Sequence, residues 1–466
     1  MERMLRVRLF LLLAISLLVI YWIEQKSPFQ QEWLHPPATL FAVLIVVLYC
    51  GYLTAAFLND KGKQWLVRWR KGQITHENTY WPSVSVIIPA YNEATVIEST
   101  VMMAMALDYP SYDVLVVDDN SRDATPEILA SLSQRFATSG RFKVLTRRQE
   151  AAHGKSTVLN EALTHVAGEV IVVFDADGYV EPDFLRRTIP LLADEEVAGV
   201  QARKLISNAE TNWWTRCQAY EYAFDAHIQS CRSLVQGATE LRGNGQLVKR
   251  QALAAVGGWN EASVTDDLDL STRLHMAGWD IQFAHDVTVW EEGITDFISL
   301  LRQRRRWAEG SLIRYLQFMG GVLFAGNVSV RTKIDLVVYL INFLFPLWLV
   351  LDYGVMLAGV FSGDPSLKTH MLLSLAMAPF LILLFMPTIC VAIYRFTRPS
   401  ISESIIGATF VSIYISLVWF PVVFWVVLKV LFRLGHPLKW DKTAHHGHAS
   451  AETSLPTALP GSRSVG

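Results

Sequence analysis

Long apolar runs lie near both ends of the chain, and its middle has none. The residues are almost wholly hydrophobic in the following stretches: Leu9–Ile23, Leu40–Leu58, Ile334–Phe361, Met371–Tyr394 and Ile405–Phe432. A helix needs about 20 such residues to cross a bilayer, and buried helices of soluble proteins rarely sustain that length. The pattern therefore predicts two transmembrane helices within residues 1–60 and further ones within residues 333–432.

Between these regions, short apolar runs alternate with helical stretches. The short runs are rich in Val and Ile: VSVIIPA (84–90), DVLVVDD (113–119), FKVLT (142–146) and EVIVVFDAD (169–177). EATVIESTVMMAMAL and ATPEILASLSQRFA, which lie between them, place apolar residues near helical spacing. Strands that alternate with helices predict a mostly parallel sheet built from βαβ units.

The distribution of positive charge predicts the side of the membrane on which this section lies. The residues before the first apolar run are basic, and so is KGKQWLVRWRKG (61–72) after the second, whereas the loop between the runs has little positive charge. The positive-inside rule places both basic flanks, and the section up to about residue 332, in the cytoplasm. Three full C-terminal spans would put the basic tail outside. One segment could be re-entrant or broken at Pro346 or Pro421, so the number of C-terminal spans stays open.

Composition agrees with a membrane protein and disfavours nucleic acid as a partner. Hydrophobic residues make up 52% of the chain, and its formal net charge is −2, so no overall positive field attracts nucleic acid. The final stretch, AETSLPTALPGSRSVG, has low hydrophobicity and predicts disorder. We divide the chain into two membrane helices (1–60), a cytoplasmic domain (61–307) and an amphipathic interfacial segment (308–332). Further membrane helices (333–432) and a basic, then disordered, tail (433–466) follow.

Acidic residues follow the predicted strands, where parallel sheets bind their ligands. Asp175 and Asp177 are separated by one residue, and such a pair can hold a divalent ion, Mg²⁺ or Mn²⁺, that also contacts a diphosphate. A solvated acidic turn is the alternative. No G-x-G-x-x-G follows the first strand, which disfavours a dinucleotide-binding domain.

Gly154-Lys155-Ser156 has the ending of a phosphate-binding P-loop, but the pattern is incomplete. A P-loop needs another glycine five residues before Gly154, and Gln149 stands there. Glutamine does not readily make that tight turn. The loop must serve another function than ATP hydrolysis.

Two further clusters carry candidate chemistry. In TDDLDL (265–270) an aspartate could take the proton from an attacking hydroxyl, or Thr265 and the acids could cap a helix, and the two roles can coexist. In LRQRRRWAEGSLIRYLQF (301–318) the arginines could bind phosphate or lipid headgroups. We expect Gln303, Arg306 and Trp307 to face a site, and Arg302 and Arg305 to face lipid.

The section from Pro82 to Gly310 contains six motifs in a fixed order: IIPAYNE, VVDDNSRD, HGKSTVLN, FDADG, TDDLDL and QRRRW. Together they make this section resemble membrane-embedded, inverting glycosyltransferases of family 2. The resemblance implies an α/β GT-A nucleotide-sugar domain inserted between transmembrane α-helices. It also implies a UDP-sugar donor, with Mg²⁺ or Mn²⁺ held by Asp175 and Asp177.

The resemblance further implies roles for single residues. On the donor side, Pro89, Tyr91 and Glu93 would line a uridine pocket. Asp118 or Asp119 would read the uracil and ribose, and Lys155 would lie beside the nucleotide. Asp267 corresponds to the catalytic base, and Asp266 replaces the family's glutamate beside it, which leaves open which carboxylate acts. Gln303, Arg306 and Trp307 match the motif that contacts the acceptor and the leaving diphosphate.

Two kinds of acceptor remain open. ELRGNGQLVKR (240–250), TDDLDLSTRLHMAGWDI (265–281) and RRRWAEGSLIRYL (304–316) resemble the cyanobacterial branch that transfers glucose to diacylglycerol. That branch implies an integral protein of a bacterial membrane, the cyanobacterial cell or thylakoid membrane, with the lipid bilayer and diacylglycerol as partners. A processive β-polysaccharide synthase is the alternative, and the donor sugar stays undetermined.

Overall fold

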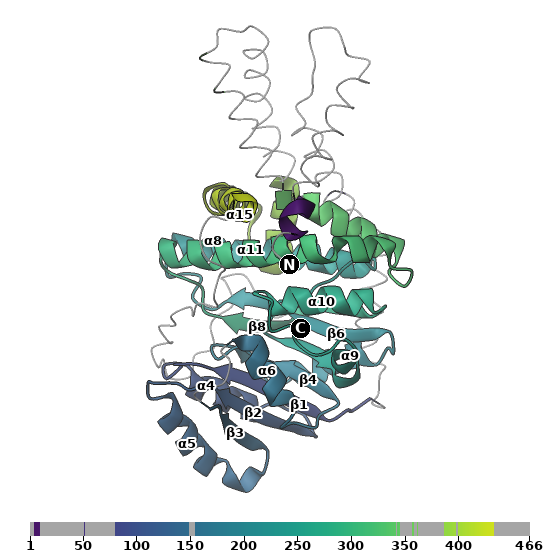
Figure 1. The fold of residues 1–466 in the computed structure, drawn as a ribbon. Coiled ribbons are helices and arrows are strands. Elements are labelled where there is room, and N and C mark those ends of the chain that lie inside the picture. Colours follow the sequence, from purple (N-terminus) through teal and green to yellow (C-terminus); the bar gives the residue numbers. More distant parts are fainter. Residues whose placement is uncertain are drawn as a thin grey trace.

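The computed structural model describes residues 80–148, 154–341, 386–397 and 399–432, together with residues 4–9, 51, 343, 344, 357 and 361 (Figure 1). The predicted spans within residues 1–60 and the predicted tail at 433–466 therefore lie almost entirely outside the described residues, as does Pro346.

An eight-stranded sheet forms the centre of the described structure, in the order β3-β2-β1-β4-β7-β6-β8-β5. Its strands are β1 Val84–Ala90, β2 Tyr112–Asp118, β3 Phe142–Thr146, β4 Val170–Val173, β5 Tyr179–Val180, β6 Val197–Ile206, β7 Gln246–Lys249 and β8 Asp280–Glu291. Strands β3, β2, β1 and β4 are parallel, as are β6 and β8, whereas β7 and β5 run opposite to their neighbours. The predicted mostly parallel sheet is confirmed.

The four strands predicted from the sequence are present, and the last is shorter than its apolar run. β4 ends at Val173, so the acidic residues after it lie in a loop. Alternate residues of β1 enter two hydrophobic cores: Val86 and Ile88 pack with α4 and α5, and Ile87 packs with α6 and α10. Burial of both faces explains why these strands are continuous apolar runs.

The helices cover both faces of this sheet and build a layer above it (Figure 1). They are α4 Ile97–Met105, α5 Thr125–Arg135, α6 Lys155–Leu163, α7 Phe184–Thr188, α8 Trp213–Leu234, α9 Arg250–Ala255, α10 Asp266–Met276, α11 Phe297–Phe324, α14 Ile401–Tyr414 and α15 Phe420–Phe432, with short turns η1 Ala137–Ser139, η2 Ile189–Leu192 and η3 Ile415–Trp419. The arginine motif lies inside α11, which continues without a break past residue 308.

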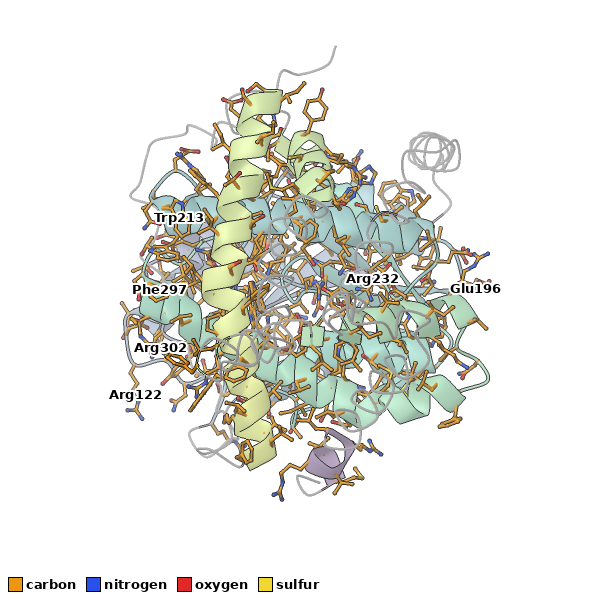
Figure 2. The ribbon with its side chains drawn as sticks, turned by 90° about the horizontal axis from the view of Figure 1, so that it is seen from above. Arg122, Glu196, Trp213, Arg232, Phe297 and Arg302 are labelled. Carbon is orange, nitrogen blue, oxygen red and sulfur yellow. The ribbon has the colours of Figure 1, made fainter. Side chains whose placement is uncertain are left out.

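Among the residues that the structure describes, Ile401–Phe432 is the helical stretch long and apolar enough to cross a membrane. It runs as one helix across the molecule when seen from above (Figure 2). It does not break at Pro421, because the π-helical turn η3 precedes the proline, and such a turn can accommodate the missing backbone donor. Lys429 joins it to Glu309 of α11 through a buried ion pair of 2.8 Å.

Candidate active site

Lys155 begins helix α6 and reaches the loop after β4. Its Nζ lies 2.5 Å from Asp175 Oδ1. Burial lowers the pKa of the Lys155 ammonium, but the carboxylates of Asp175, Asp266 and Asp267 outweigh burial, so its pKa is raised above the ordinary lysine value. The structure therefore brings the loop lysine together with both predicted acidic clusters.

The loop that carries Asp175 and Asp177 is held by neighbouring segments. The Asp175 N–H donates to Asn244 Oδ1 at 3.1 Å, and Asp177 Oδ2 accepts from the Glu292 N–H at 3.1 Å. Both aspartates are half-buried. Backbone hydrogen bonds therefore hold this loop at the carboxyl ends of the strands, with both carboxylates partly exposed.

The acids after Thr265 divide into two groups. Asp269 pairs with Arg273 at 2.6 Å within α10, whereas Asp266 and Asp267 lie close enough to Lys155 for its charge to lower their pKa values. Burial has the larger effect and raises the pKa of both, that of Asp266 to about 6. Thr265 occupies the N-cap position without a capping side-chain hydrogen bond.

The loop before β7, which includes Arg242, Gly243 and Asn244, lies next to Asp267 and was not predicted as part of the site. Gly243 has φ +83°, a conformation that favours glycine. A Cβ at this position would lie 3.5 Å from Asp267 Oδ2 and 3.6 Å from Lys155 Nζ. Buried Gln201 supports the loop, donating to the Asn244 carbonyl at 2.9 Å and accepting from the Arg242 N–H at 2.6 Å. The only sequence signal was RGNGQ, within the segment 240–250 that resembles the branch that transfers glucose to diacylglycerol.

The residues predicted to bind uridine lie side by side at the ends of β1 and β2. The Asp119 N–H donates to the Ala90 carbonyl at 2.8 Å, which joins the segment of Pro89, Tyr91 and Glu93 to the two aspartates. The Asp119 carboxylate pairs with buried Arg147 at 2.5 Å. Asp118 accepts from the Ser121 N–H at 3.2 Å and is buried. Arg147 was not among the predicted residues.

The arginine motif contains an anchor that sequence reasoning missed. Arg304, fully buried, pairs with Glu221 of α8 at 2.7 Å and donates to Tyr414 of α14 at 3.0 Å. Its guanidinium lies 4.3 Å from the centre of the Trp307 ring. Gln303, Arg306 and Trp307 are half-buried on α11, Arg302 is exposed, and Arg305 is half-buried.

The donor set fits a divalent cation only if a substrate completes the coordination. Within the described part of the chain, no group of three or more His, Cys, Asp or Glu side chains is placed to hold a metal. Mg²⁺ commonly binds through one or two carboxylates together with substrate phosphates and water. The carboxylates of Asp175 and Asp177 match that kind of site.

A mostly parallel sheet with acidic loops at its carboxyl edge is typical of α/β domains that bind a ligand beyond the ends of their strands. Residues 82–310 match the family described as "Glycosyltransferase like family 2". This section of the chain belongs to glycosyltransferase family 2.

Curated relatives agree with this family. The chain is 44% identical to the "Beta-monoglucosyldiacylglycerol synthase" of Trichormus variabilis over 263 residues, which are 56% of this chain and 55% of the relative. The protein of the same name from Synechocystis sp. is 44% identical over 269 residues, 57% of this chain and 55% of that protein. The chain thus spans about half the length of the curated relatives it matches.

A solved structure shares the fold. The mannosyltransferase PcManGT from Pyrobaculum calidifontis, whose structure is described as a complex with GDP-Man and Mn²⁺, superposes with a TM-score of 0.52 at 22% identity. The alignment covers 80% of this chain and 99% of that one. At this identity the likeness supports the GT-A-like fold alone.

Proposed function

We propose that the protein transfers glucose from UDP-glucose to diacylglycerol and inverts the anomeric carbon, which gives a β-monoglucosyldiacylglycerol. The observation that carries this proposal is the meeting of Lys155, Asp175 and the Asp266–Asp267 pair at one edge of the sheet. The choice of acceptor is supported by the names of the relatives that are 44% identical.

On the donor side, the nucleoside would lie across the ends of β1 and β2. Pro89, Tyr91 and Glu93 would line its pocket, and Asp118 would read the base and ribose. Asp119 is already paired with Arg147, so its role would be to fix this side of the nucleoside pocket. Lys155 and Arg306 would offset the charge that grows on the leaving diphosphate.

Asp175 and Asp177 would hold a divalent cation, Mg²⁺ or Mn²⁺, against the diphosphate. When bound, such a cation acts as a Lewis acid that stabilises the developing negative charge.

On the acceptor side, Asp267 would accept the proton of the attacking hydroxyl. Its Oδ1 is oriented by the Leu268 N–H at 2.8 Å, and its Oδ2 lies on the side of Gly243 and Lys155. The hydroxyl oxygen bonds to the anomeric carbon as the bond to UDP breaks, and one displacement inverts the configuration. Gln303 and Trp307 would contact the acceptor.

The test of the proposed function is transfer by the purified chain in detergent with Mg²⁺, diacylglycerol and radiolabelled UDP-glucose, UDP-galactose or UDP-N-acetylglucosamine. We expect label from UDP-glucose in a chloroform-soluble monoglycosyl lipid. Label in a long insoluble or viscous glycan would instead identify a polysaccharide synthase and overturn the proposal.

Replacing Asp177 with Asn should lower transfer about 10²-fold or more, because a lost stabilising group of this kind costs about 10²–10³ in rate. Initial rates after chelator treatment, with Mg²⁺ or Mn²⁺ added back, measure the effect, and the variant should need more metal for half-maximal activity. Asp194→Asn, at an exposed position, is the matched control. Full activity of the chelated protein would contradict the metal assignment.

A further inference from the structure

A lysine of β6 is fixed beside the site by a glutamate of β8. Lys204 Nζ lies 2.7 Å from Glu291 Oε2, with only 16% and 12% of the two side chains exposed. The Tyr222 hydroxyl of α8 donates to Glu291 Oε1 at 2.5 Å. Glu291 is thus held through both oxygens, and it holds Lys204 in turn.

Two aromatic rings flank this lysine. Its Nζ lies 5.4 Å from the centre of the Tyr222 ring and 5.9 Å from that of Trp307, both within the range of a cation–π contact. Trp307 belongs to the arginine motif of α11. Lys204 therefore lies between the sheet and the helix assigned to the acceptor.

Lys204 also lies close to the proposed base. Its Nζ donates to the Arg242 carbonyl at 3.4 Å, and Arg242 precedes Gly243, which lies against Asp267. The charge of Lys204 is one of those that lower the pKa of Asp267 against the larger effect of burial. Contact and charge both place Lys204 on the acceptor side of the reaction.

We propose that Lys204, held by Glu291 and flanked by Tyr222 and Trp307, binds an ester carbonyl oxygen of the acceptor lipid. The inference rests on the proposed function. A diacylglycerol has one hydroxyl, which must lie at Asp267 to react, and its remaining polar atoms are ester oxygens that can only accept hydrogen bonds. An ammonium has three donors, and the described contacts use two of them, to Glu291 and to the Arg242 carbonyl.

The experiment compares two acceptors that differ only at the ester carbonyls, 1,2-dioctanoylglycerol and its ether analogue 1,2-dioctylglycerol. Hydrogen bonds to charged groups predict a KM for the ether about 10- to 100-fold above that for the ester in the unmodified protein. Lys204→Met should raise the KM for the ester to that for the ether and leave the KM for UDP-glucose unchanged. Lys204→Arg should retain part of the preference.

Lys143→Met is the matched control, because Lys143 pairs with Asp113 on the exposed side of β3 and should leave the preference intact. If Lys204→Met does not fold, the double variant Lys204→Met with Glu291→Gln removes both charges. The KM values for the ester and the ether are then compared in that variant. Retention of the ester preference by a folded Lys204 variant overturns the inference while the proposed function stands. Failure of the unmodified protein to glycosylate either glyceride overturns both.

Discussion

Asp267→Asn should lower the rate of sugar transfer by about 10²- to 10⁴-fold, the usual contribution of a general base. Asparagine keeps the shape of the side chain and can still accept the hydrogen bond from the Leu268 N–H, but it cannot take a proton at this pH. Binding of UDP should remain close to that of the unmodified protein, because Asp267 acts on the acceptor. Initial rates with labelled UDP-glucose and calorimetric UDP titrations measure the two quantities.

The neighbouring acid provides the control for this assignment. Asp266 also lies near Lys155, and burial raises its pKa to about 6, so charge alone does not distinguish the two aspartates. We expect Asp266→Asn to retain much more activity than Asp267→Asn. Near-normal turnover of Asp267→Asn, with Asp266→Asn inactive, would move the base to Asp266.

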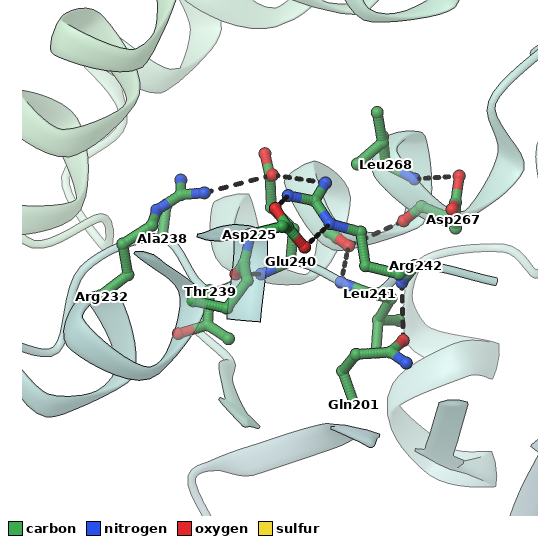
Figure 3. Close-up of polar contacts among 12 residues, drawn as sticks. Gln201, Asp225, Arg232, Ala238, Thr239, Glu240, Leu241, Arg242, Asp267 and Leu268 are labelled. Carbon is green, nitrogen blue, oxygen red and sulfur yellow. Dashed lines mark hydrogen bonds and ion pairs between the residues drawn. The ribbon is translucent and has the colours of Figure 1, made fainter. Parts of the chain in front are cut away.

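Glu240→Gln should destabilise the protein by about 3–5 kcal/mol, the range found when a buried ion pair loses one partner. Glu240 is 1% exposed and lies among several arginines (Figure 3). Its oxygens lie 2.6 Å from Arg314, 3.0 Å from Arg242 and 3.2 Å from Arg232. Burial works against the carboxylate, but these cations outweigh it and hold the pKa of Glu240 well below its usual range.

Thermal unfolding in detergent measures this loss, with Glu196→Gln as the control. Glu196 is exposed (Figure 2), so its variant should unfold within experimental error of the unmodified protein. The same Glu240 variant should lose activity below its unfolding temperature, since Arg242 and Gly243 lie in the segment that Glu240 fixes. An unchanged unfolding midpoint would mean that the arginines find other partners.

More residues of the proposed donor side than of the proposed acceptor side could be predicted from the sequence. Strands β1 to β4 are continuous apolar runs, and Asp175 and Lys155 follow local patterns, so periodicity and motifs were sufficient there. Lys204 and Glu291 meet only because β6 and β8 are paired, and no spacing along the chain shows such a meeting.

The arginines illustrate the same limit. LRQRRRW indicated charges for phosphate or lipid, yet Arg304 is fully buried. Its environment is built by Glu221 and Tyr414, from helices far away in the sequence. A charged residue in a motif shows that a charge is needed, and only tertiary packing decides whether it serves a ligand or the fold.

The reversed direction of β7 has a consequence for how the two sides of the proposed site are connected. Because β7 runs opposite to β4 and β6, the segment that leads into it reaches the same edge of the sheet as the segment that leaves β4. The loops proposed to hold the nucleotide follow the parallel strands β1, β2 and β4, whereas Arg242–Asn244 precedes the antiparallel strand β7. An insertion or exchange in that one segment should therefore affect both sides of the proposed site at once, the base through Gly243 beside Asp267 and the metal-binding loop through Asn244 beside Asp175.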